Sequence, residues 1–594
     1  MIYQPSAKQS VSSRVTILLL GFTLLSVGCN LASDNDVTVT DDSFAIADGS
    51  PIPEVRPNII VILADDLGYS DIAPYGSEIE TPNLNRLAQD GVRFSNFYNT
   101  ARCSTTRASL LTGLYSHQTG LGSMPFLPVN TEEPSYRGDF NSSLTVAEFL
   151  RPAGYATYMV GKWHITPYLN NEKSNWPLQR GFDRFYGTIT GAGSYFEPTT
   201  LTDGNQRVFA ADDSDYYYTD VISQHATTFI NDHALDSPTK PFFLYVAYTA
   251  PHWPLHAPEE TIAKYKGHYD AGWDEIRERR ISRLVDLGIL DEDVVLPSRD
   301  SGVSAWDETI DKAWHARAME TYAAQVDHLD KGIGKILAAL EVAEQLDNTL
   351  ILFLSDNGAA AEIIEPSWAK WLLGDEGDDL AGIRTTRDGD DVAYGNDVSI
   401  LPGDNGSYQS YGVGWANASN TPFKGYKKES YEGGTETPFI MHWPNGSLAA
   451  GAIERAPGHV IDIVPTLVNL AKASDQNEPN DESQSSLVGL NLLDPGFREL
   501  ANERALYFEH YGDLSVRSGP WKAVFPAPDG PWELYDMNSD PTELMDISSS
   551  HPDRLLDMQQ QWFGWAARVG ARVPNGAVDD SNQTPKLEII GNLE

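Results

Sequence analysis

A continuous run of apolar residues at 59–64, IIVILA, is the feature that most constrains the fold of this chain. A strand with one face in water alternates apolar and polar residues, whereas a continuous β-branched run is buried on both faces. Similar runs recur at 242–247 and 350–354. Helical patterns lie between them at 81–91, 144–154 and 316–340. The sequence therefore predicts an α/β fold with a large central, mostly parallel sheet flanked by helices.

Two stretches without helical or strand periodicity divide the chain. Residues 374–420 are rich in Gly, Asp and Tyr, and we expect a functional rim insertion there. Residues 474–486 are polar and predict a linker. Beyond it, short strands over 505–536 and a helix near 553–569 predict a smaller α+β unit with a short antiparallel sheet. The predicted domains are a main domain at 56–473 and a C-terminal subdomain at 487–594.

The N-terminus has the composition of an export signal. Lys8 and Arg14 precede the apolar stretch 15–25, which is short for a membrane span, and small residues lead to Cys29. We expect residues 1–29 to direct export from a bacterium, with an acidic tether at 30–55. Lipidation of Cys29 would give an outer-membrane lipoprotein attached to the membrane, whereas ordinary signal cleavage would give a periplasmic protein.

Charge and cysteine content narrow the function classes. The formal net charge is −42, from 84 Asp and Glu against 42 Lys and Arg. A surface of that sign repels phosphate backbones, so we expect no nucleic-acid partner. The two cysteines are Cys29 and Cys103, which excludes a disulfide framework. Removal or lipidation of Cys29 leaves Cys103 as the only thiol of the mature chain.

Acidic residues directly follow two of the predicted buried strands. Asp65 and Asp66 come after the first run, and Asp356 and Asn357 come soon after the third. In open α/β sheets, ligands collect at the carboxyl ends of the strands. Three carboxylates and an amide oxygen at that edge would bind a hard divalent cation. Helix capping or a turn is the alternative for either pair alone, but two pairs in equivalent settings favour the metal.

Cys103 and Arg107 stand four residues apart, in front of a helical pattern at 108–113. A thiol at a helix N-terminus beside an arginine lies in positive potential, which favours a thiolate. A small buried cysteine is the alternative, although the polar neighbours argue against apolar burial.

Basic residues and histidines also follow predicted strands. Lys162 and His164 come after one strand and His252 after another, while Lys427 and Lys428 lie just beyond the rim insertion. Singly, such residues are more often surface charges. Together with the acid pairs they predict an anion site that holds one cation and can transfer protons.

Nine separated segments resemble the type I sulfatase family, which depends on formylglycine and lies within the alkaline-phosphatase-like superfamily. The resemblance runs from residue 56 to about residue 573. In chain order the segments are PNIIVILADDLGYSDIAPYG, TPNLNRLAQDGVRFSNFYNT, CSTTRASLLTG, GKWH, QRGFDRFYG, APHWPLHAP, SDNG, SNTPFKGYKKESYEGG and WELYDMNSDPTELMD. The resemblance implies an arylsulfatase-like sulfuric ester hydrolase that acts on an aryl or carbohydrate sulfate.

The resemblance also implies roles for the candidate residues. Cys103 matches the cysteine that a maturation enzyme oxidises to formylglycine (3-oxoalanine), whose hydrated aldehyde attacks sulfur. His164 matches the base that takes a proton from the second hydroxyl and so expels sulfate. The other matches are Arg107 for the motif arginine, Lys162 for a sulfate contact, and His252 and Lys427 for residues that bind sulfate and assist departure of the alcohol.

One Ca²⁺ ion is implied as the cofactor, with Mg²⁺ as the alternative. Its ligands by resemblance are Asp65, Asp66, Asp356 and Asn357, together with the formylglycine derived from Cys103. Such a cation offsets charge that builds on the sulfuryl oxygens. Asp356 would also take the proton of the nucleophile.

The chain departs from the family pattern at three places. Thr105 stands where the family has Pro or Ala, within the short motif that maturation enzymes read, and Tyr431 stands where relatives often carry His. Lys427 is followed by Lys428, and the spacing to Glu432 favours Lys427 as the active-site lysine.

Two other functions compete with sulfate ester hydrolysis. One is hydrolysis of phosphonate monoesters or phosphodiesters by the same superfamily, and the other is an inactive sulfatase-like surface binding protein. The retained segments CSTTR, GKWH and APHW favour the sulfatase. The expected partner is a sulfated small molecule or saccharide, with Trp253, His256, Tyr195 and Trp415 expected at the rim of the site.

Overall fold

The computed structural model describes residues 56–169, 172–210, 216–374, 380–473, 487–528 and 530–577. Several predicted segments lie outside the described residues, namely the export segment with Cys29, the tether at 30–55, the linker at 474–486 and the end of the C-terminal subdomain at 578–594. Among the residues that are described, no helix has both the length and the apolar character needed to cross a membrane.

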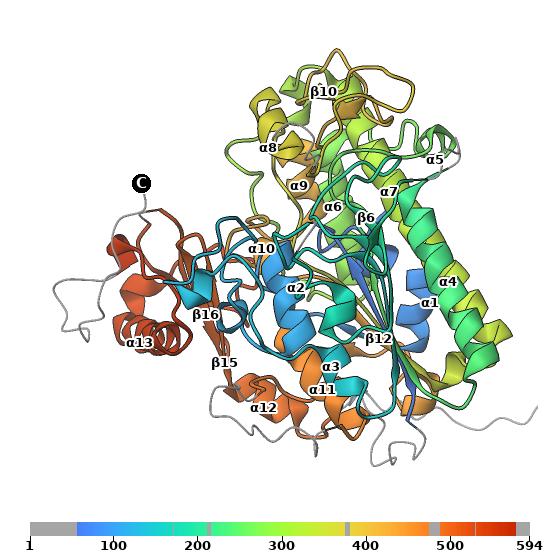
Figure 1. The fold of residues 1–594 in the computed structure, drawn as a ribbon. Helices are drawn as coiled ribbons and strands as arrows, with labels where there is room; N and C mark the ends of the chain where they lie inside the picture. Colours follow the sequence, from blue (N-terminus) through green and yellow to red (C-terminus); the bar gives the residue numbers. More distant parts are fainter. Residues whose placement is uncertain are drawn as a thin grey trace, which may run out of the picture. The chain divides into compact units, whose positions relative to one another are not determined.

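A ten-stranded sheet in the order β13-β2-β12-β9-β1-β8-β4-β5-β6-β7 forms the centre of the fold (Figure 1). β1 (Asn58–Ala64) lies between β8 (Phe242–Ala247) and β9 (Thr349–Ser355) and is parallel to both. β4 (Ala156–Lys162) and β5 (Arg184–Thr188) extend the parallel part beyond β8. The other strands are β2 (Val92–Phe94), β6 (Leu201–Asp203), β7 (Gln206–Arg207), β12 (Phe439–His442) and β13 (Ile453–Glu454). The predicted mostly parallel sheet is confirmed.

The side chains of β1 alternate between two apolar cores, and the whole strand is therefore buried. Ile60 and Ile62 pack in one core, and Ile59 and Val61 pack in the other. Figure 1 shows the helices of the two cores on opposite sides of the sheet. The first core includes α1 (Pro82–Asp90), α4 (Tyr218–Asp236) and α7 (Lys312–Val342), and the second includes α2 (Cys103–Thr112), α3 (Val146–Leu150) and α11 (Ile463–Leu470).

A four-stranded antiparallel sheet follows in the C-terminal part, and α13 (Pro552–Val569) packs against it. Trp562 of α13 is fully buried, and its indole N–H donates to the carbonyl of Phe508 at 3.0 Å. Trp562 belongs to the same apolar core as α2 and α3, so packing is continuous between the two sheets. The strands are β15 (Ala505–His510), β16 (Asp513–Ser518), β17 (Trp521–Phe525) and β18 (Glu533–Asp536), which confirms the predicted α+β element.

The stretch at 374–420 is more regular than the sequence predicts. It ends in α9 (Gly412–Ser419), a helix whose glycines obscure the helical periodicity of its sequence. Trp415 of α9 is fully buried among aromatic rings, and its N–H donates to the carbonyl of His315 at 2.7 Å. The expectation that Trp415 lies at the rim of the site is therefore wrong. The remaining elements are α5 (Glu259–Lys264), α6 (Gly272–Asp286), α8 (Ala369–Leu373), α10 (Glu432–Thr435), α12 (Phe497–Glu503), β3 (Phe97–Tyr98), β10 (Ala393–Tyr394), β11 (Ser407–Tyr408) and β14 (Gly458–His459).

Candidate active site

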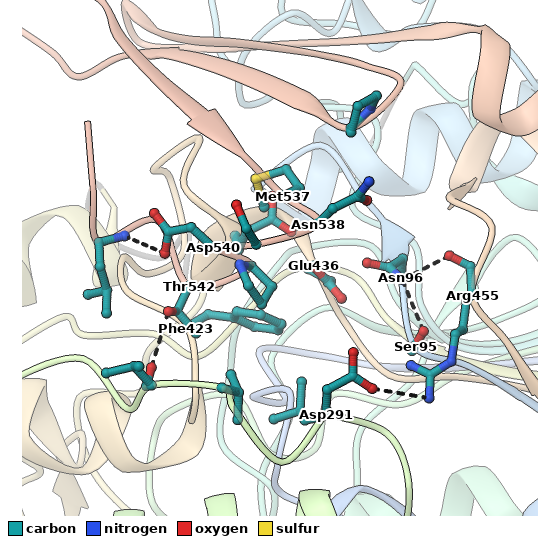
Figure 2. Close-up of a pocket in the computed structure, with 18 of the residues that line it drawn as sticks. Ser95, Asn96, Asp291, Phe423, Glu436, Arg455, Met537, Asn538, Asp540 and Thr542 are labelled. Atoms are coloured by element: carbon teal, nitrogen blue, oxygen red, sulfur yellow. Dashed lines mark hydrogen bonds and ion pairs between the residues drawn. The ribbon is translucent and has the colours of Figure 1, made fainter. Parts of the chain in front are cut away.

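In the described part of the chain, the cavities large enough for a small molecule include an open hollow of about 840 Å³ beside α6, which none of the predicted site residues lines, and two more enclosed ones. One, of about 730 Å³, lies between the 537–545 segment and the loop at 289–295, with Glu436 and Arg455 in its wall (Figure 2). None of the predicted site residues lines it. The other, of about 460 Å³, is lined by Cys103, His164, His252 and Lys427. The second cavity is therefore the candidate active site.

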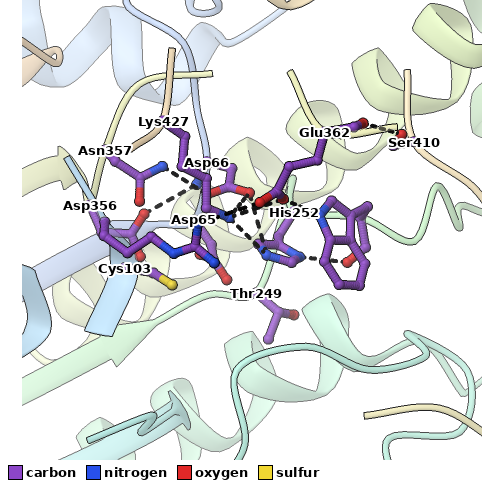
Figure 3. A network of polar contacts seen from close by, with 12 residues as sticks. Asp65, Asp66, Cys103, Thr249, His252, Asp356, Asn357, Glu362, Ser410 and Lys427 are labelled. Atoms are coloured by element: carbon purple, nitrogen blue, oxygen red, sulfur yellow. Dashed lines mark hydrogen bonds and ion pairs between the residues drawn. The ribbon is translucent and has the colours of Figure 1, made fainter. Parts of the chain in front are cut away.

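The predicted site residues come together because their strands are parallel neighbours. Asp65 and Asp66 follow β1, Asp356 follows β9, Lys162 ends β4, and His252 lies in the loop after β8. The carboxyl ends of these strands meet at one edge of the sheet. Figure 3 shows the acids, Cys103, His252 and Lys427 grouped at that edge.

Each acid is buried and engaged with a cationic side chain. Lys162 Nζ lies 2.5 Å from Asp65 Oδ2, and Lys427 Nζ lies 2.7 Å from Asp66 Oδ2. Arg107 donates from Nε and Nη2 to Asp356 Oδ2 at 3.1 and 2.8 Å, and from Nη1 to the Lys162 carbonyl at 3.0 Å. Arg107 therefore holds the ends of β4 and β9 together.

Two oxygens in this cluster suit a cation. Asp65 Oδ1 and Asn357 Oδ1 are buried and have no hydrogen-bond partner among the described residues. Ligand atoms of Asp65, Asp66 and His252 lie within 4.8 Å of one another. Burial raises the pKa of Asp65 well above its usual range, so a cation beside it would stabilise its charged form. Asp65 Oδ1 lies 3.6 Å from Arg107 Nη2, beyond hydrogen-bond distance. Buried oxygens without hydrogen bonds are costly, and a hard cation would satisfy them.

Several residues of the site have left-handed backbone conformations that are unfavourable for residues other than glycine. The φ angles are 61° at Asp66, 60° at Ala101, 58° at His164 and 88° at Lys428. Each costs about 1–3 kcal/mol, and such strain concentrates at functional sites. At Lys428 the strained turn leaves this side chain 39% exposed while Lys427 points inward to Asp66.

Cys103 is the first residue of α2 and is buried, with Sγ 3.5 Å from His164 Nδ1. Burial raises the pKa of the thiol, despite the opposing charges of Lys162 and Lys427. Desolvation therefore outweighs the positive potential expected at the start of α2, and Arg107 turns to Asp356 instead. Burial also lowers the pKa of His164 well below its usual range, which keeps its ring neutral.

His252 is neutral with a defined tautomer. Its Nδ1 lies 2.6 Å from the carbonyl of Trp253 and donates to it, which leaves Nε2 as an acceptor 3.2 Å from Lys427 Nζ. Burial lowers the pKa of His252 to about 3. Although burial acts in the opposite direction, Asp66 and Glu362 raise the pKa of Lys427. Lys427 is therefore the protonated member of this pair.

Sequence reasoning missed Glu362, which pairs with Arg102, Lys427 and Lys428 close to the cavity. It accepts hydrogen bonds from Trp253 Nε1 at 2.8 Å and Arg102 Nη1 at 3.4 Å, and its Oε1 lies 2.7 Å from Lys428 Nζ. Glu362 lies in an irregular segment, and its partners are far away in the sequence. No local signal identifies it.

The other expected rim residues have different places. Trp253 lines the cavity. Tyr195 is buried, and its hydroxyl donates to the carbonyls of Thr249 and His252 at 2.7 and 2.8 Å. His256 is also buried, 2.6 Å from the carbonyl of Ser407. Tyr195 and His256 therefore support the His252 loop and do not form the rim.

The two remaining departures from the family pattern also have structural roles. Thr105 lies in the first turn of α2, where its hydroxyl donates to the carbonyl of Arg102 at 2.9 Å. Tyr431 faces away from the cavity and donates to Glu533 at 2.7 Å, beside the C-terminal sheet. Tyr431 therefore contacts the C-terminal sheet and does not line the cavity.

Comparisons with known proteins agree with this geometry. The Sulfatase family model matches residues 57–473. An uncharacterized sulfatase of Schizosaccharomyces pombe is 33% identical over 87% of this chain and 94% of its own length. An arylsulfatase of Klebsiella aerogenes is 32% identical over 74% of this chain and 91% of its own length. The structure of Ps i-CgsB with k-i-k-neocarrahexaose is 26% identical, with a TM-score of 0.59 over 86% of this chain and 93% of the other.

A parallel sheet with acids, lysines and histidines at its carboxyl edge, together with these relatives, defines a hydrolase of the alkaline-phosphatase-like class. The chain belongs to the sulfatase family and is a sulfatase, an enzyme that hydrolyses sulfate esters.

Proposed function

We propose that this sulfatase uses a formylglycine formed from Cys103 and one bound Ca²⁺ ion. The main support is the convergence on Cys103 of the acid cluster, two lysines and His164, whose Nδ1 lies 3.5 Å from Sγ. Because burial raises the pKa of the thiol, Cys103 itself is a poor nucleophile. Formylglycine supplies a hydrated aldehyde, which provides one hydroxyl to attack sulfur and a second that allows sulfate to leave.

Asp65, Asp66, Asp356 and Asn357 would hold the cation, which stabilises negative charge on the sulfate oxygens. The oxygens of Asp65 and Asn357 that lack hydrogen bonds fit this role, with Arg107 Nη2 as the nearby cation 3.6 Å from Asp65 Oδ1, and Mg²⁺ is the alternative ion. Arg107 binds Asp356 through two N–H groups and fixes the orientation of its carboxylate. Arg107 thus positions Asp356, which accepts the proton of the nucleophile.

The lysines and histidines bind sulfate and move protons. Lys162 and Lys427 pair with Asp65 and Asp66, and they would turn to sulfate oxygens if a bound cation neutralised these acids. Lys427 donates the proton to the leaving alcohol, and neutral His252 orients the Lys427 ammonium through Nε2. Neutral His164 accepts the proton whose removal releases sulfate.

Mass spectrometry of the peptide that contains Cys103, from protein made in its native host, tests the nucleophile. We expect the mass of formylglycine, formed by a maturation enzyme that accepts Thr105. An unmodified thiol in every molecule would refute the proposal.

Side-by-side kinetics on a sulfate ester and on a phosphate diester test the reaction class, and a higher kcat/KM for the diester would favour the phosphodiesterase alternative.

We also propose that the chain is exported and carries a lipid on Cys29. The support is the signal-like sequence before Cys29 and the acidic tether after it. Labelling cells with a radioactive fatty acid should mark the wild-type protein and leave a Cys29→Ala variant unmarked. Equal labelling of both proteins would contradict lipidation at Cys29.

A further inference from the structure

The outer wall of the active-site cavity is apolar. One side consists of Met124, Pro125, Phe126 and Leu127, and another side carries Trp371 of α8. Phe126, Leu127 and Trp371 are 37%, 59% and 60% exposed. Large apolar side chains that gather at one exposed place mark a binding surface. This surface continues directly into the cavity that holds the reaction centre.

The buried side of α8 fixes the position of Trp371. The adjacent Leu372 is fully buried in a small apolar core together with Trp253 and Ala381. Trp253 and Ala381 also line the cavity. The packing of Leu372 therefore positions α8 so that Trp371 stands at the cavity mouth.

The polar groups in the outer wall already have partners. Thr166 donates to Asp139 at 2.7 Å, and the hydroxyls of Thr190 and Thr200 lie 2.6 Å apart. The Trp253 indole N–H donates to Glu362. A sugar ring buried against this wall would leave several hydroxyls without hydrogen-bond partners, and each unpaired group opposes binding.

The outer wall also lacks cations that a polyanion could use. Arg102 and Lys427 are the Arg and Lys residues among the described residues that line the cavity. Arg102 and the nearby, partly exposed Lys428 pair with Glu362, and Lys427 belongs to the reaction centre. With a net charge of −42, the chain as a whole repels sulfated polymers. The cavity therefore suits one sulfate group on an otherwise uncharged molecule.

We propose that the substrate is a monosulfate ester of a bulky apolar alcohol, whose apolar part lies between the Phe126–Leu127 segment and Trp371. This inference rests on the proposed function and names the substrate class of the same site. Phe126, Leu127 and Trp371 are specificity-determining residues that do not touch the reacting atoms. A cavity of about 460 Å³ is large enough for a fused-ring or medium-chain group.

Kinetics with three substrates test the proposal. Two are the apolar esters naphthyl sulfate and decyl sulfate. The third is D-glucosamine-2-N,6-O-disulfate, which is the substrate bound in a solved structure with 20% sequence identity to this chain. We expect the apolar esters to have the higher kcat/KM, and the ratio between them separates aryl from alkyl preference. Trp371→Ala and Leu127→Asp should each raise KM for the preferred ester about tenfold and leave kcat within about twofold. Leu235→Asp, at an 82% exposed apolar position of α4, is the matched control and should change neither constant.

Binding of naphthalenesulfonate, which cannot be hydrolysed, separates this inference from the proposed function. Tryptophan fluorescence should report binding to the wild type and to a Cys103→Ser variant, and binding about tenfold weaker to Trp371→Ala. If naphthalenesulfonate binds but no ester is hydrolysed, the proposed function is wrong and the proposed apolar binding pocket still stands. Preference for the disulfated sugar, or equal binding to the wild type and Trp371→Ala, would overturn the inference.

Discussion

At the scale of single residues, His164 shows how much local structure is needed to place one functional group. Its backbone is left-handed, with φ 58°, and its N–H donates to the carbonyl of Ile189 at 3.1 Å. The imidazole then lies over Gly191, where a Cβ atom would come within 2.2 Å of the ring. A glycine at 191 is therefore required for the imidazole to reach Cys103.

Gly191→Ala should lower kcat about a hundredfold, because the added methyl group displaces the His164 ring and misplacement of about 1 Å has effects of that size. Gly193→Ala is the matched control, since its Cβ would meet only the Ala381 carbonyl at 3.8 Å. Steady-state kinetics and thermal unfolding of both variants provide the measurement. Equal kcat values for the two variants would show that the His164 position does not matter.

Glu362 should set the alkaline limit of activity. Its Oε2 lies 3.6 Å from Lys427 Nζ and helps to raise the pKa of Lys427. Glu362→Gln removes that negative charge, so the pKa of Lys427 falls and the proton donor is lost at a lower pH. The alkaline limb of kcat/KM against pH should move to lower pH. Glu365→Gln, at an exposed neighbouring position, is the control and should leave the alkaline limb in place. If the limb does not move in Glu362→Gln either, Lys427 is not the proton donor.

Residues of the site differ in how far the sequence predicts them. Asp65 and Asp356 were predictable because each directly follows a strand whose apolar run is unmistakable. Glu362 and Gly191 were not, since they lie in irregular segments and act on partners that only the fold brings near. The protonation state of Cys103 was also beyond the sequence, because burial determines it.

At the scale of elements, continuous apolar runs predicted β1, β8 and β9, because a strand that is buried on both faces has apolar residues along its whole length. The helix α9 was missed. Its sequence, GVGWANAS, contains two glycines and a tryptophan that packing alone stabilises. Tertiary contacts, and not helix propensity, determine that element.

A buried ion cluster joins the C-terminal sheet to the segment that carries Lys427. Lys522 of β17 lies 2.6 Å from Glu432 of α10 and 2.9 Å from Glu543, and all three are buried. Lys522→Met should lower the free energy of unfolding by about 3–5 kcal/mol, because two buried carboxylates lose their cation. Lys335→Met, which breaks an exposed pair with Asp220, should cost about 1 kcal/mol or less.

Urea unfolding of these two variants measures the difference. Adding Glu432→Gln to Lys522→Met should restore part of the lost stability, because one of the unpaired charges is removed. If both single variants unfold at the same urea concentration, the cluster does not join the two parts.

At the scale of the whole molecule, the net charge of −42 contrasts with the local arrangement of the site. Cations that bind anywhere on such a surface would reduce self-repulsion and stabilise the fold. A specific Ca²⁺ site must therefore be separated from this general effect. Substitution of Asp65 or Asn357 separates the two effects, because their buried oxygens would bind the ion but do not contribute to screening at the surface.

Protein stripped with a chelator should lose activity and unfold at a lower temperature, and Ca²⁺ should restore both. Binding to the folded state alone stabilises by about 2.7 kcal/mol at a hundred times the dissociation constant. Asp65→Asn should abolish this saturable gain and keep only the small, non-saturating gain that any divalent cation gives by screening the acidic surface. If Ca²⁺ raises the unfolding temperature of the wild type and of Asp65→Asn equally, the effect comes from the acidic surface, and the ion does not occupy the carboxyl edge of β1.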